Sequence, residues 1–142
     1  MVSKNINGLE FIKVGQSYFV SSKEIAKRFK KRHDNIVRNI RALKQSPSYI
    51  DSNNTLNIEE GEYTDISGKI NKIYLLDRGS FTLIVMGFTG AKLFPMKLRF
   101  LNAFVEIDNM LIDDLLYIIK KRDNQIKELK KEKTRGISRF FN

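Results

Sequence analysis

Residues 21–44 have the sequence SSKEIAKRFKKRHDNIVRNIRALK. This stretch contains two short amphipathic patterns that meet at a basic junction. Ser21 and Glu24 have the spacing of a capping box, in which each side chain bonds the free backbone N–H of the other residue. We therefore expect a helix to begin there. Its apolar face would be formed by Ile25, Ala26 and Phe29.

A second helix is predicted from Asp34 to Lys44. Its apolar face would be formed by Ile36, Val37, Ile40 and Leu43. Asp34 lies in the first turn, where a negative charge is favourable because of the helix dipole. Two short amphipathic helices joined by a short junction predict a helix-turn-helix.

The outward face of the second predicted helix carries side chains that suit DNA. Arginine and asparagine can make paired hydrogen bonds to guanine and adenine edges, and a helix fits the major groove, which is about 12 Å wide. We expect base contacts from Asn35, Arg38 and Arg41. Basic side chains around the helix ends would instead meet phosphates, namely Lys30, Lys31, Arg32, His33 and Lys44. The alternative is a charged face that is merely solvated, with His33 a structural helix-start residue.

The composition favours an acidic partner. The 142 residues carry a formal net charge of +10 and a sequence pI near 9.8, which suits nucleic acid or an anionic membrane. We expect no membrane contact and a cytoplasmic location, because no apolar run approaches about 18 residues and the first residues lack the apolar core of a secretion signal. With no cysteine and one histidine, we expect no disulfide, metal site or cofactor.

Two β-hairpins are predicted around these helices. Residues 56–64 and 70–76 flank a turn-rich connection at residues 65–69, and residues 11–14 and 18–20 flank Gly15. A hairpin directly after a helix-turn-helix is the arrangement of a winged helix, and its tip would add phosphate contacts from Lys69 and Lys72. Residues 46–65 have five acidic and no basic side chains, so a DNA-facing surface should exclude them.

The segment that follows predicts a further helix and completes an α+β fold. Asp77 is placed as the N-cap of a helix over residues 79–86. We expect this helix to be structural. Its apolar surface would come from Phe81, Ile84, Val85 and the following Phe88.

Two blocks of sequence resemble a known family. Residues 31–43, KRHDNIVRNIRAL, and residues 74–92, YLLDRGSFTLIVMGFTGAK, are similar to signature blocks of the phage regulatory protein Rha family. The second block is the more specific, because simple periodicity does not explain it. The resemblance covers about residues 10–110 and implies a small regulator of temperate phages or prophages, acting in a bacterial host cell. This sequence departs from the family pattern at residues 93–96, where Pro95 would shift or kink the start of the next helix.

A long helix is predicted from about Pro95 to Lys133. Apolar residues at 3-4 spacing predict a coiled-coil dimer seam at Leu98, Leu101, Val105, Ile112, Leu115, Ile119, Ile126 and Leu129, interrupted by Asp108 and Arg122. Residues 98–107 have a broader apolar face and would also pack on the preceding domain. The expected organisation is a DNA-binding domain over residues 1–92, the long helix over 93–135 and a tail over 136–142.

The sequence favours a DNA-binding transcription regulator. A homodimer would present two recognition helices to half-sites about one DNA turn, roughly 34 Å, apart. The alternative is an antirepressor or interaction module whose long helix binds another phage or host regulator. RNA binding lacks an exposed aromatic platform. An enzyme is not expected, because no set of acid, base or nucleophile converges.

Overall fold

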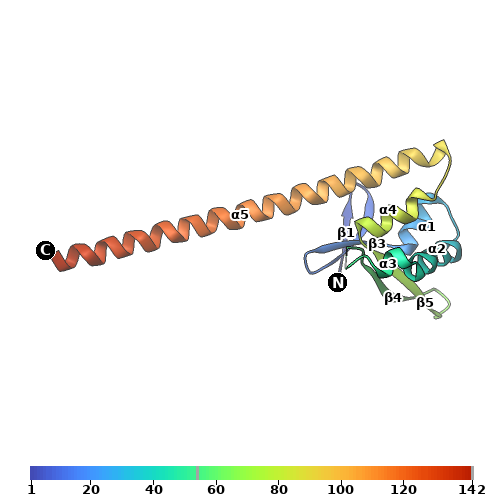
Figure 1. The fold of residues 1–142 in the computed structure, drawn as a ribbon, viewed down its shortest axis with the longest axis horizontal. Helices are drawn as coiled ribbons and strands as arrows, with labels where there is room; N and C mark the ends of the chain where they lie inside the picture. The colour runs from blue at the N-terminus through green and yellow to red at the C-terminus, as the bar shows by residue number, and fades with distance from the viewer. Residues whose placement is uncertain (54, 142) are drawn as a thin grey trace. The chain divides into compact units, whose positions relative to one another are not determined.

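The computed structural model describes residues 1–53 and 55–141, and side chains as far as residue 137. The chain divides into two compact units, Met1–Phe104 and Val105–Asn142, which we describe separately. The first unit is built on a five-stranded antiparallel sheet with the strand order β1-β2-β3-β5-β4 (Figure 1). The strands are β1 (Val2–Ile6), β2 (Leu9–Val14), β3 (Ser17–Ser21), β4 (Ile58–Thr64) and β5 (Ile70–Leu76).

Both predicted hairpins are confirmed, β2–β3 and β4–β5, and they join through the pairing of β3 with β5. Strand β1 was not predicted. It pairs with β2 through a two-residue turn in which Asn7 and Gly8 both have positive φ, 55° and 76°. An Asn-Gly pair favours this turn, but β1 buries only Ile6, so the strand has no apolar alternation to reveal it.

The helices α1 (Ser22–Phe29) and α2 (His33–Gln45) follow β3 directly, as predicted. The capping box forms only in half. Ser21 Oγ accepts from Glu24 N at 3.1 Å, but the buried Glu24 carboxylate accepts from the backbone N–H of Glu10 and pairs with Arg28 at 3.3 Å. The difference arises because Ser21 is also the last residue of β3 and pairs with Leu75, so the glutamate bridges to β2 instead.

The remaining helices are α3 (Pro47–Ile50), α4 (Arg78–Met86) and α5 (Phe94–Phe141). A 3₁₀ turn, Ala91–Leu93, precedes α5. Pro95 therefore lies in the first turn of α5, where its missing N–H has no helical partner to lose. Helix α5 continues through Gly136, within the segment that the sequence separates as a tail.

Phe100 lies at the centre of the core of the first unit. It is fully buried, stacks on Phe29 at a centroid distance of 5.7 Å, and meets Phe81 at 4.7 Å and Phe11 at 6.3 Å. The start of α5 thus joins β2, α1 and α4 in a single aromatic cluster. The prediction that the first part of the long helix contributes apolar packing agrees with this arrangement.

The N-cap residue of α4 stabilises the start of this helix, and its contribution can be tested. Asp77 Oδ1 accepts from Ser80 N at 3.0 Å, as the sequence predicts. Replacing Asp77 by alanine should lower the free energy of unfolding by about 0.5–2 kcal/mol, because the backbone N–H of Ser80 loses its hydrogen-bond acceptor. Urea unfolding measures the loss. Asp77→Ser keeps a cap oxygen and should recover most of the stability, whereas equal losses in both variants would contradict the capping role.

In the second unit, described to residue 137, the predicted seam residues of α5 are exposed. Ile112, Ile119 and Ile126 keep 52, 54 and 49% of their surface, and Leu115 and Leu129 keep 59 and 64%. A coiled coil through these residues therefore remains a prediction. Among residues 1–53 and 55–141, none of the helices combines the length and the hydropathy of a membrane-spanning segment.

Candidate nucleic-acid interface

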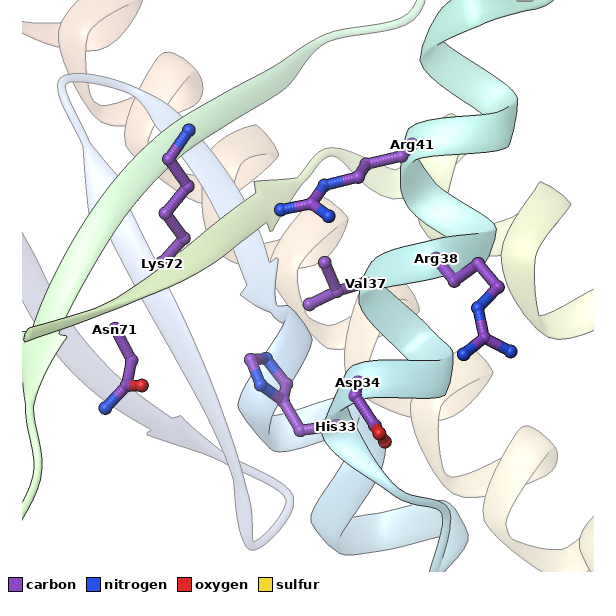
Figure 2. Close-up of a pocket in the computed structure, with 7 residues that line it drawn as sticks. All are labelled: His33, Asp34, Val37, Arg38, Arg41, Asn71 and Lys72. Atoms are coloured by element: carbon purple, nitrogen blue, oxygen red, sulfur yellow. The ribbon is translucent and has the colours of Figure 1, made fainter.

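A cleft of about 410 Å³ separates α2 from β5 (Figure 2). It is lined by His33, Asp34, Val37, Arg38 and Arg41 of α2, and by Asn71 and Lys72 of β5. The cleft brings together two predicted base contacts and two predicted phosphate contacts from segments about thirty residues apart in sequence. Besides His33, its charged lining is three cations, Arg38, Arg41 and Lys72, and one carboxylate, Asp34.

The buried side of α2 orients the predicted base contacts. Ile36 and Ile40 are fully buried, so the opposite face of the helix, with Asn35, Arg38 and Arg41, is exposed. In Figure 2, Arg41 extends towards the β4–β5 hairpin, whereas Arg38 extends from the other side of α2. Arg41 Nε donates to Tyr74 Oη at 3.4 Å, which steadies its guanidinium beside β5.

The hairpin wall of the cleft is ordered by its own turn. Asp65 accepts from Ser67 Oγ, from Asn71 Nδ2 at 3.0 Å and from the backbone N–H of Lys69 at 3.0 Å. These hydrogen bonds, first that of Ser67, hold the pKa of Asp65 below its usual value. The turn is therefore fixed, while the side chains of Lys69 and Lys72 remain exposed.

His33 is partly buried and contacts neighbouring side chains of the protein. Its Nε2 lies 2.8 Å from Ser22 Oγ, which also accepts from Tyr74 N at 3.0 Å, and its ring meets Tyr63 edge-on. Burial, with Lys23 nearby, lowers the pKa of His33 below its ordinary value of 6.5, against an opposing effect of Asp34. His33 therefore ties the start of α2 to α1 and β5, which is the structural role that the sequence left open.

This environment predicts a pH dependence of stability. Because the pKa of His33 is lower in the folded state, the unfolded chain binds the proton first as the pH falls below 6.5. The stabilisation is complete above that pH and should be lost as the pH falls through the folded pKa. Thermal unfolding between pH 7.5 and about 5 should show a smaller fall in Tm for His33→Gln than for wild type. Parallel profiles for the two proteins would contradict the assignment.

The other predicted phosphate contacts differ in how far their side chains already contact other groups of the protein. Lys44 pairs with Glu60 at 3.1 Å, and this hydrogen bond lowers the pKa of Glu60. Arg32 pairs with Asp34 at 3.0 Å on the surface. Lys31 lies over the ring of Phe88 at 4.7 Å. Lys30 is exposed in a left-handed conformation at the end of α1, where φ is 54°.

Sequence reasoning missed three features of the cleft. Asn71 lines the cleft from β5, and Tyr74 of the same strand contacts Arg41. The available signal was the spacing of Lys72 and Tyr74, because residues two apart lie on one face of a strand. The acidic stretch is also less segregated than expected, because Glu60 on β4 reaches Lys44 at the end of α2. Strand pairing creates that contact across 16 residues, and no local pattern encodes it.

Residues 20–109 match the family described as phage regulatory protein Rha. An uncharacterized protein of Haemophilus influenzae is 37% identical over 97 residues, which cover 67% of this chain and 56% of the relative. The chain thus spans little more than half the length of that relative. No solved structure matches significantly. The chain belongs to the phage regulatory protein Rha family.

Proposed function

We propose that this chain is a phage or prophage regulator that binds specific duplex DNA, with α2 entering the major groove. The observation that carries the proposal is the basic cleft between α2 and β5. Arg38 and Arg41 project from the exposed face of α2, and Lys72 stands on the opposite wall. A helix with exposed arginines beside a lysine-bearing hairpin suits simultaneous contacts to base edges and phosphates.

The order of elements supports a winged-helix mode of binding. The strand β3 leads into α1 and α2, and the hairpin β4–β5 returns to pair β5 with β3. In such an arrangement α2 is the recognition helix and the turn at residues 65–69 is the wing tip. Asn35, Arg38 and Arg41 would then contact bases. Phosphates would be met by Lys30, Lys31, Lys69 and Lys72, with Arg32 and Lys44 available if they exchange their carboxylate partners.

The experiment that tests this function measures binding to fragments of the genome that encodes the protein. Fluorescence anisotropy at several salt concentrations should find one fragment bound far more tightly than bulk DNA, about 10³-fold or more. Uniform weak binding with a steep salt dependence would reduce the interaction to phosphate attraction and contradict the proposal.

A second candidate function rests on a separate observation, the exposed apolar face of α5. An antirepressor or interaction module would use that face to bind another regulator. Replacing Ile112, Ile119 and Ile126 by serine should then abolish regulation while leaving DNA affinity unchanged. If instead replacing Arg38 and Arg41 by glutamate abolishes DNA binding and regulation together, this second function is excluded as the main one.

A further inference from the structure

The charge of α5 changes sign along the second unit. Residues 105–119 carry four acidic side chains and no basic one, whereas residues 120–135 carry eight basic and three acidic ones. All of these charged side chains are exposed. The two halves therefore have net charges of −4 and +5 on neighbouring lengths of one helix. A partner that matches this helix must carry the opposite sequence of charges.

The same part of α5 exposes an apolar stripe. Its members recur at 3-4 spacing and keep about half or more of their surface, namely Ile112, Leu115, Ile119, Ile126 and Leu129. A stripe of this length in water is unfavourable and is typical of a surface that another helix covers. Arg122 interrupts the stripe between its two halves.

We propose that residues 105–135 of two copies of this chain pair as antiparallel helices. A parallel pair in register would set −4 against −4, +5 against +5, and Arg122 against its own copy within the stripe. An antiparallel pair sets the acidic half of each helix against the basic half of the other. Charge complementarity thus selects both the occupant, a second copy, and its direction.

The apolar spacing fixes the register of the pair. Antiparallel helices bring the first position of each 3-4 repeat opposite the second position of the partner. Ile112 then faces Leu129 of the second copy, and Leu115 faces Ile126. At the centre, Ile119 faces Arg122, whose aliphatic stem can cover it while the guanidinium reaches solvent. Each contact occurs twice, by symmetry.

Disulfide crosslinking tests this register, because the natural chain has no cysteine. Full-length Ile112→Cys and Leu129→Cys proteins are mixed, allowed to exchange and oxidised. The expected product is the mixed disulfide, since the paired Cα atoms would lie within disulfide reach of about 7 Å. The Ile112→Cys protein alone should form no disulfide-linked dimer, because the two cysteines of the pair would lie about 25 Å apart along the helices.

Asn124→Cys is the matched control, since this exposed residue lies off the stripe. Mixed with Ile112→Cys, it should give no mixed disulfide. Efficient crosslinking of Ile112→Cys to itself would overturn the antiparallel arrangement in favour of a parallel one, and equal yields in all mixtures would overturn any defined pairing. A monomer in sedimentation analysis of the wild type would overturn self-association. None of these readouts involves DNA, so they are independent of the proposed function.

Discussion

Replacing Arg38 and Arg41 together by glutamate is expected to abolish specific DNA binding. Both side chains line the cleft from the exposed face of α2. A good paired contact from arginine to a base contributes about 1–3 kcal/mol of discrimination, so losing two should weaken specific binding by about 30-fold or more. The reversed charge adds repulsion from nearby phosphates. Fluorescence anisotropy on the tightest genomic fragment measures the change.

The matched control changes the net charge equally at two residues that do not line the cleft. Lys4 on β1, at the other edge of the sheet, and Lys92 before α5 are both exposed. Their double replacement by glutamate should cost far less specific affinity. If the two double variants lose affinity equally, net charge and not the cleft governs binding, and the assignment of α2 as the recognition helix is wrong.

Replacing Phe100 by alanine is expected to cause the largest loss of stability. Phe100 is fully buried between the rings of Phe29, Phe81 and Phe11. Removing a buried phenylalanine ring costs about 3–5 kcal/mol, a large share of the stability of a small domain. Urea unfolding followed by tyrosine fluorescence measures the loss, since four of the five tyrosines lie in residues 1–104.

Phe94→Ala provides the control on the same helix. Phe94 keeps 69% of its surface, so the same substitution should change the free energy of unfolding by less than about 0.5 kcal/mol. Comparable losses at Phe94 and Phe100 would mean that α5 does not close the core of the first unit. A small loss at Phe100 alone would contradict its central position in the aromatic cluster.

Local signals predicted most of the first unit. The cap residues Ser21 and Asp77 mark the starts of α1 and α4, and helical periodicity at Ile36 and Ile40 gives the buried face of α2. These signals depend on neighbours within about one helical turn, so the sequence carries them directly. Strand β1 escaped prediction because its stability comes from pairing with β2 and not from its own apolar pattern.

The candidate site was predicted on its helical side and, on the hairpin side, at Lys72. The exposed face of α2 follows from the buried one, so Arg38 and Arg41 could be named from the sequence. The engagement of His33 with Ser22, and of Lys44 with Glu60, depends on how α1 and the hairpin pack against α2. Such contacts between distant segments decide which cations of the cleft region are already paired within the protein, and they require the tertiary structure.

The most direct test of the central claim is a methylation protection experiment on the bound genomic fragment. Dimethyl sulfate modifies guanine N7, which lies in the major groove. Wild-type protein should protect guanines within the bound site. Arg38→Glu and Arg41→Glu together should remove that protection at protein concentrations that saturate the wild-type complex. Unprotected guanines in a fragment that the wild type binds tightly would contradict the entry of α2 into the major groove.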